Sequence, residues 1–136
     1  MSAAAITLPI AYDRSFSLHV YWVSHGLLLL RSGKTNKFSS RIDILFSDVR
    51  WMALPVWFEG IRIERGEPSD IPLALTAKIK EEVNFMTVFR VTSQGVTHCL
   101  LAGGGVRVVE DQQDYYADFS LLPNLDFRAF DAPLQT

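Results

Sequence analysis

The chain has 136 residues, a length that fits one domain with a substantial hydrophobic core. Hydrophobic residues make up 49% of it and charged residues 21%, which is typical of globular proteins and excludes a largely disordered chain. The formal net charge of −2 gives no general attraction to nucleic acid or to an anionic membrane surface. We therefore expect a single domain over residues 1–136 that binds neither nucleic acid nor a membrane.

Cysteine content and apolar runs bear on the cellular compartment. Cys99 is the only cysteine, so no disulfide can form within the chain and a reducing compartment is expected. Residues 1–14 lack the basic region and apolar run of a secretory signal. No apolar run approaches the ~18 residues that span a bilayer. These features predict a soluble, cytoplasmic protein.

The first part of the chain predicts an arm and a hairpin. We expect residues 1–12 to form a loose N-terminal arm. Residues 16–23 alternate between apolar and polar side chains, which is the pattern of a half-buried strand. Residues 27–31 are apolar on both faces, as a central strand would be. Gly26 suits the positive φ of a tight turn, so the two strands are predicted to pair.

The stretch from residue 41 to residue 65 holds two of the three tryptophans, and its hydrophobic period changes. Apolar side chains occupy even positions before Ser47–Asp48 and odd positions after it, a change that would move the side chains of a regular strand to the opposite face. A kink or bulge is therefore predicted there. Pro55 ends regular pairing because it has no N–H group. Residues 61–65 then alternate again and predict a further strand.

Residues 71–84 fit either of two structures. Apolar residues alternate along part of this stretch like those of a strand. However, Ser69 or Asp70 could cap a helix with Pro72 in its first turn, and the composition favours a helix. We expect one helix near residues 71–83, with a strand as the alternative.

The remaining sequence predicts more strands. Gln94–Gly95 is a hairpin signal between two strand patterns, residues 85–93 and 96–102. We expect the first of these strands to bury one face, made by Phe85, Phe89 and Val91. The three glycines at positions 103–105 predict a sharp bend or a close approach to another backbone.

The pattern as a whole predicts a mainly β fold. A strand pattern resumes after the glycines, and the aromatic-rich C-terminal residues are expected to dock on the body of the domain. About seven to nine short, mostly antiparallel strands are expected, in a barrel or a sandwich. With the helix near residues 71–83, the class would be α+β.

Two glycine motifs are incomplete. Gly33-Lys34-Thr35 matches the end of a phosphate-binding P-loop, but the glycine required five positions earlier is replaced by Leu28, and a strand rather than a helix is predicted to follow. Lys34 and Lys37 are expected at the tip of an exposed loop. The triple glycine lacks the third glycine of a dinucleotide-binding fingerprint, where Val108 stands. No cofactor is predicted.

Histidine and cysteine spacings match no metal motif, so no metal site is predicted. An enzyme using His19, His25 or Cys99 is one functional alternative, although a structural role is expected for each of them. His19 is expected to be a surface or hydrogen-bonded residue. Asp43 is expected on the solvent side of its strand, between two isoleucines that face the core.

Aromatic residues around Pro55 give the one candidate binding surface. Trp51 and Trp57 have odd positions and Phe58 an even one, so a single strand face cannot bury all three. Tryptophan and arginine are common at interface hot spots. The candidate surface comprises Arg50, Trp51, Trp57, Phe58 and Arg62. The alternative is that all three aromatics belong to the core.

A non-catalytic protein-binding domain is therefore the leading functional hypothesis. It would be of the adaptor, regulatory or toxin-neutralising type, and it would bind another protein or itself as a homo-oligomer. An alternative is a small β-barrel that holds an apolar ligand in its interior. This alternative is suggested by the strand at residues 27–30, which is apolar on both faces.

Overall fold

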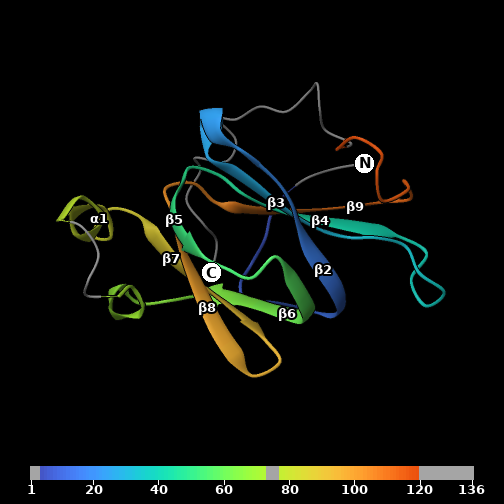
Figure 1. The fold of residues 1–136 in the computed structure, drawn as a ribbon, viewed down its shortest axis with the longest axis horizontal. Helices are drawn as coiled ribbons and strands as arrows, with labels where there is room; N and C mark the ends of the chain where they lie inside the picture. The colour runs from blue at the N-terminus through green and yellow to red at the C-terminus, as the bar shows by residue number, and fades with distance from the viewer. Residues whose placement is uncertain (1–3, 73–76, 120–136) are drawn as a thin grey trace.

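In the part of the chain that the structure describes, nine strands pair antiparallel into one strongly curved sheet, in the order β1-β9-β4-β3-β2-β6-β7-β8-β5 (Figure 1). The structure is a computed structural model and describes residues 4–72 and 77–119. In chain order the strands are β1 (Ala4–Ala5), β2 (Ile10–Trp22), β3 (Leu27–Ser32), β4 (Arg41–Phe46), β5 (Val49–Ala53), β6 (Trp57–Arg65), β7 (Thr87–Ser93), β8 (Val96–Ala102) and β9 (Val106–Asp111). The predicted mainly β, antiparallel class is confirmed.

The sheet does not close into a barrel, which was one of the two predicted architectures. The two edge strands, β1 and β5, do not pair with each other. Both are short, with two residues in β1 and five in β5. Strand β5 ends just before Pro55, which has no N–H group to donate to a neighbouring strand. The fold is therefore an open, curved sheet.

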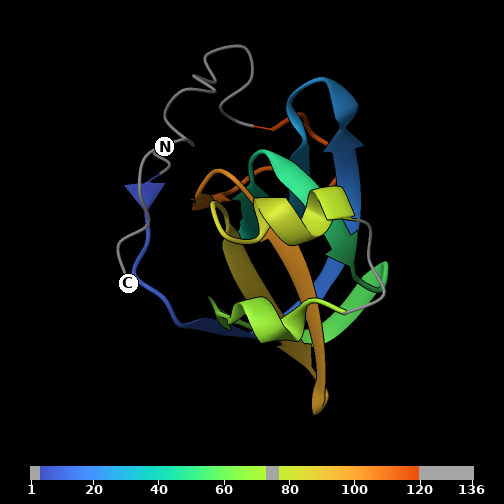
Figure 2. The same ribbon diagram turned by 90° about the vertical axis from the view of Figure 1, so that its left-hand side faces the viewer.

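Among the described residues, one short α-helix accompanies the sheet. This helix, α1 (Ala77–Glu82), lies within the predicted range of residues 71–83, of which residues 73–76 are outside the described part. Two 3-10 turns, η1 (Val23–His25) and η2 (Pro68–Asp70), complete the helical elements of the described residues. Figure 2 shows α1 and η2 in front of β7 and β8, where they cover a small outer cluster around Val88 and Leu101.

The main core fills the inside of the curved sheet. Sixteen buried residues of the described ranges belong to it, and the rings of Phe46 and Phe89 meet there at a centroid distance of 5.2 Å. A second buried cluster lies on the outer face and includes Leu27, Leu29 and Phe119. Strand β3 contributes to both clusters and is buried along its whole length, which confirms the central strand predicted from its apolar faces.

The predicted kink between β4 and β5 is present at Ser47–Asp48. Asp48 has a φ of 53°, in the left-handed region, and the chain then turns into β5. The amides of Gly103 and Gly104 donate to the carbonyls of Asp48 (2.8 Å) and Ser47 (3.1 Å). The amide of Val49 donates to Gly26 O at 2.9 Å. The triple glycine therefore provides both the bend and the close backbone approach that were predicted.

Local predictions were right at the hairpins and wrong at two positions. The β2–β3 and β7–β8 hairpins form, with positive φ at Gly26, Gln94 and Gly95. Phe85 is 86% exposed and precedes β7, because the strand begins only at Thr87. Part of the expected loose arm also joins the sheet, since Ala4–Ala5 pairs with β9 and Ile10 begins β2.

We predict that Gly26→Ala destabilises the fold by about 2–4 kcal/mol, the sum of left-handed strain and a backbone clash. A Cβ at Gly26 would lie 2.9 Å from Val49 N, at a φ of 58°. The control is Gly95→Ala, where φ is 75° but no atom of the described residues lies within 4 Å of the new Cβ, so only the ~1–2 kcal/mol of strain is expected. Urea unfolding of both variants measures the difference, and equal losses would contradict the role of the Gly26–Val49 contact.

Candidate functional site

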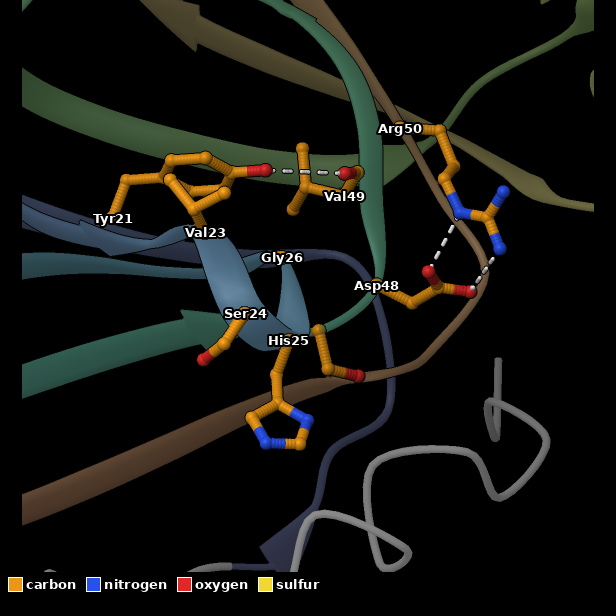
Figure 3. Close-up of a pocket in the computed structure, with 9 residues that line it drawn as sticks. Tyr21, Val23, Ser24, His25, Gly26, Asp48, Val49 and Arg50 are labelled. Carbon is orange, nitrogen blue, oxygen red and sulfur yellow. Dashed lines mark hydrogen bonds and ion pairs between the residues drawn. The ribbon is translucent and has the colours of Figure 1, made fainter.

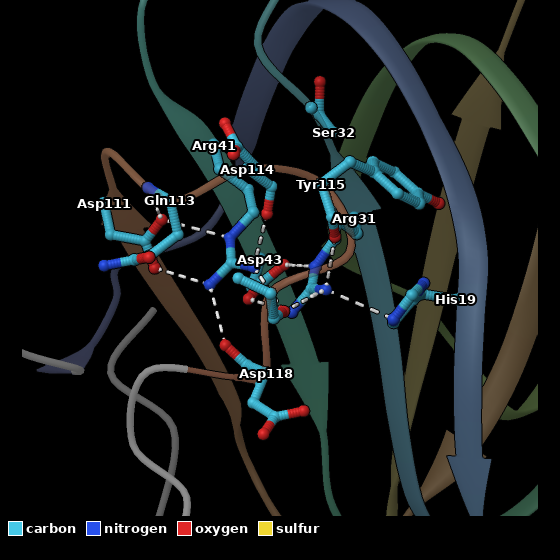
Figure 4. A network of polar contacts seen from close by, with 12 residues as sticks. His19, Arg31, Ser32, Arg41, Asp43, Asp111, Gln113, Asp114, Tyr115 and Asp118 are labelled. Carbon is cyan, nitrogen blue, oxygen red and sulfur yellow. Dashed lines mark hydrogen bonds and ion pairs between the residues drawn. The ribbon is translucent and has the colours of Figure 1, made fainter.

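Two buried ion pairs lie on the outer face of β3, β4 and β9 (Figure 4). Arg31 and Asp43 are register partners on β3 and β4, and they form a bidentate pair with Nε–Oδ1 and Nη2–Oδ2 distances of 2.7 and 3.0 Å. Arg41 and Asp111 are register partners on β4 and β9 and form the same arrangement at 3.0 and 2.8 Å. All four side chains are at most 3% exposed. Such planar, charge-assisted pairs are strong and geometrically specific.

The arginines also bind the backbone of residues 114–118, which we call the strap. Arg31 Nη1 donates to the carbonyls of Tyr115 (2.7 Å) and Ala117 (3.0 Å). Arg41 donates to three strap carbonyls, those of Asp114 (3.1 Å), Ala117 (2.7 Å) and Asp118 (3.1 Å). In Figure 4 both guanidinium groups lie between the strands and the strap. The strap therefore covers this face and the ion pairs beneath it.

This arrangement corrects the expectation that Asp43 faces solvent. Asp43 is 1% exposed and Arg41 is fully buried, so β4 is buried on both faces rather than one. The reason is that each acid has a basic register partner on a neighbouring strand, and the strap supplies acceptors for the Nη1 groups of both arginines. The sequence of a single strand does not identify the partner of a charged residue, because that partner lies on a neighbouring strand and depends on the strand pairing.

His19 lies beside this network on β2. Its Nε2 is 3.2 Å from Arg31 Nη1, and its ring meets Tyr115 edge-on at 5.3 Å between centroids. Burial, and next the positive charge of Arg31, lower the pKa of His19 below its usual value. The neutral ring, with Nε2 as an acceptor, is the form that suits this position. His19 is thus a hydrogen-bonded residue, one of the two roles predicted for it.

The residues proposed for catalysis lie on three different elements: His19 on β2, His25 in η1 and Cys99 on β8. Cys99 Sγ lies 3.5 Å from the Asp70 carbonyl oxygen, and burial, with a smaller effect from Asp70, raises the pKa of its thiol. A raised pKa makes the thiol a weak nucleophile at neutral pH. Within residues 4–72 and 77–119, no group of three or more His, Cys, Asp or Glu side chains is placed to hold a metal ion.

His25 lines a surface pocket of about 440 Å³ at the β4–β5 kink (Figure 3). The Asp48 carboxylate in this pocket accepts hydrogen bonds from Arg50 at 2.6 and 3.4 Å. Figure 3 shows Asp48 turned toward Arg50, with Ser24 and His25 pointing in other directions. Ser24, His25 and Asp48 therefore do not form the hydrogen-bonded chain that a serine nucleophile requires.

The structure divides the predicted binding surface. Trp57 is 54% exposed on the outer face of β6, whereas Phe58 is 1% exposed and belongs to the main core. Phe58 is therefore removed from the surface, because adjacent strand residues point to opposite faces. Arg62 follows on β6, half-exposed and 3.6 Å from Glu64.

Strand β5 carries the other two predicted surface residues. Trp51 is half-buried against the outer cluster beside α1. Arg50 pairs with Asp48 and with Glu82 of α1 at 2.6 and 3.1 Å. In the sheet order β5 is separated from β6 by β7 and β8, so the five residues do not share one strand pair.

Comparisons with known proteins add no assignment to this geometry. No family model, no curated protein and no solved structure matches the chain. Within the described residues, no helix is long and apolar enough to cross a membrane.

We predict that Asp43→Ala lowers the free energy of unfolding by about 3–5 kcal/mol, because it leaves the buried charge of Arg31 without a counter-charge. Glu64→Ala is the matched control, since it removes a partly exposed partner of the exposed Arg62 and is expected to cost at most about 1 kcal/mol. Chemical denaturation at pH 7 gives both values. A loss for Asp43→Ala no larger than that for Glu64→Ala would be inconsistent with the buried pair.

Protonation of His19 is predicted to destabilise the fold. Its folded pKa is lowered, so the unfolded chain binds the proton more readily. The contribution of neutral His19 to the free energy of unfolding is fully present above the unfolded pKa of about 6.5. It is lost as pH falls through the lower folded pKa. The nearby charges are Arg31, Arg41 and Asp43.

His19→Gln keeps an acceptor for Arg31 but cannot titrate in this range, so it isolates the effect of His19. We expect the variant to lose part of the stability change between pH 7 and pH 5 that the unaltered protein shows. Identical pH profiles of unfolding free energy for the two proteins would rule out this role of His19.

Proposed function

We propose that the chain is a non-catalytic protein-binding domain that recognises another protein through Trp57 and its surroundings on β6. The observation that carries the proposal is an exposed apolar pair, Val56 at 73% and Trp57 at 54%, at the start of a sheet strand. Tryptophan is the residue type most enriched among interface hot spots, and a large ring left in water is an unused source of binding energy.

The backbone holds this apolar pair in a fixed position. The carbonyl of Val56 accepts a hydrogen bond from Leu18 N at 2.8 Å, and Trp57 is the register partner of Ser17 on β2. The next residue, Phe58, anchors the strand in the core. A partner would therefore not have to order this segment of backbone on binding, which lowers the entropic cost of association.

Polar groups surround the apolar pair. Arg62 is half-exposed farther along the strand, with only a 3.6 Å contact to Glu64. Glu59 accepts a hydrogen bond from Ser15 Oγ at 2.7 Å. An apolar centre with a polar rim is the usual anatomy of a protein interface. A fitting partner would offer an apolar pocket for the indole and a carboxylate for Arg62.

The other two functional hypotheses receive less support. An apolar ligand would need space inside the curved sheet, and that space is occupied by core side chains, including the rings of Phe16, Phe46 and Phe89. An enzyme would need a nucleophile and a base within reach of each other. Cys99, the strongest candidate nucleophile, has a raised thiol pKa.

A photo-crosslinking amino acid at position 57, introduced in the cells that make the protein, tests the proposal. We expect one discrete crosslinked protein of a different sequence, which then binds the unaltered chain and binds Trp57→Ser and Arg62→Glu at least roughly tenfold more weakly. The control places the crosslinker at Val96, which is 55% exposed at the tip of the β7–β8 hairpin. The same crosslinks from both positions, or only self-crosslinks from position 57, would refute recognition of another protein by this face.

Stability measurements distinguish a binding role of Trp57 from a structural one. Trp57→Ser is predicted to change the free energy of unfolding by less than about 1 kcal/mol, because most of the side chain is exposed. Phe58→Ala, one position away, is predicted to cost about 3–5 kcal/mol, because it opens a cavity in the core. A loss of about 3 kcal/mol or more for Trp57→Ser, as large as that expected for Phe58→Ala, would mean that the tryptophan mainly stabilises the fold.

A further inference from the structure

A polar cavity of about 450 Å³ lies between β2, β6 and the loop that follows β3. The loop holds its shape through two internal bonds, Thr35 N to Phe38 O at 2.9 Å and Lys37 N to Thr35 Oγ1 at 3.1 Å. The size is within the range of small-molecule sites. The cavity is on a different part of the molecule from the pocket at His25, and none of its lining residues belongs to that pocket.

Arg14 is the anchor of this cavity. It is 6% exposed, and its Nε and Nη2 donate to Ser32 Oγ (2.7 Å) and to the carbonyls of Gly33 (3.0 Å) and Ser40 (2.6 Å). Its guanidinium carbon lies 4.4 Å above the centre of the Phe38 ring. These contacts fix the guanidinium group in one orientation.

The charge of Arg14 has no contacting carboxylate among the described residues, unlike the charges of Arg31 and Arg41. Its Nη1 makes no hydrogen bond to those residues either. None of the fully buried side-chain nitrogens or oxygens of the described residues lacks a partner, so Nη1 is not completely buried. Arg14 is among the residues that line the cavity. Burial lowers the pKa of Arg14, as expected for a desolvated cation, and Glu110 opposes this only in part. A bound anion would offset the free-energy cost of removing the Arg14 cation from water.

Other donors converge on the same cavity. Lys37 lines it and makes no ion pair within the described part of the chain, and Ser17 and Thr35 contribute hydroxyl groups. Lys34 is also at the wall, although it already contacts Asp114 and the Gln112 carbonyl, both at 3.0 Å.

The acids of the cavity limit what it can accept. Asp13 and Glu59 line it and would repel an anion placed near them. Glu59 already accepts a hydrogen bond from Ser15, and the cation-bearing wall belongs to Arg14 and the loop. An anionic group is therefore favoured at that wall, with a neutral or polar body extending toward the acids.

We propose that this cavity binds the phosphate group of a small phosphorylated molecule, with Arg14 Nη1 and Lys37 as the two charged donors. A phosphate monoester carries a charge near −2 at neutral pH and three acceptor oxygens, which matches two cations and adjacent hydroxyl groups better than a carboxylate does. Gly33, Lys34 and Thr35 line the cavity, but the site is not a P-loop. Arg14 and Lys37 take the place of the helix N-terminus that holds the phosphate in a P-loop.

Calorimetric titration at constant ionic strength, with phenyl phosphate, inorganic phosphate and benzoate as probes, tests the proposal. We expect phenyl phosphate to bind most tightly and benzoate most weakly. Lys37→Glu is expected to weaken phenyl phosphate binding by roughly tenfold or more, because a charge-assisted contact becomes repulsive. Lys80→Glu on α1 is the matched control, an exposed lysine outside the cavity.

Two further measurements keep the test decisive. Arg14→Lys retains the positive charge but loses the planar, forked arrangement of the guanidinium N–H donors. Circular dichroism shows whether this variant still folds. If it does, it should bind phenyl phosphate more weakly than the unaltered protein. Amide NMR shifts on titration should concentrate at residues 33–37. No binding at millimolar phenyl phosphate, equal effects of Lys37→Glu and Lys80→Glu, or shifts centred on His25 would each overturn the proposal.

Discussion

The structure depends on two arginines that are buried between the sheet and the strap. Arg31 and Arg41 each bind a carboxylate on the neighbouring strand, and each turns its remaining N–H groups toward backbone carbonyls of residues 114–118. Burying a charge is costly unless the charge is paired and hydrogen-bonded, and for Arg31 and Arg41 these two conditions are met by different parts of the chain. The strap and the strands β3, β4 and β9 are therefore mutually dependent.

This constraint also accounts for where functional surface is available. The inner face of the sheet is filled by the main core, the outer face of β3, β4 and β9 is covered by the strap, and the outer face of β7 and β8 is covered by α1 and η2. The outer face of β6 carries Trp57 in the open, and Arg14 borders a cavity nearby on β2. The proposed protein-binding face and the proposed phosphate site both lie on this less covered part of the molecule.

Local sequence patterns predicted the local structure well. The apolar run at residues 27–30 indicated a central strand, and the change of period at Ser47–Asp48 indicated the kink, because both follow from side-chain direction alone. Charged residues could not be placed in this way. Asp43 was expected on the solvent side of its strand, and only the pairing of β4 with its two neighbours, together with the strap, explains its burial and that of Arg41. Trp57 and Phe58 were likewise indistinguishable until the strand's faces were known.

Hydrogen exchange tests the central claim most directly, in a variant that replaces the buried pair by apolar side chains, Arg31→Met with Asp43→Leu. No buried charge is then left unpaired, so the sheet can remain folded while the strap loses the Arg31 bonds to Tyr115 and Ala117. The account predicts faster exchange of amides in residues 114–118, with unchanged protection in β6, β7 and β8. Unchanged exchange in the strap of the folded variant would contradict it.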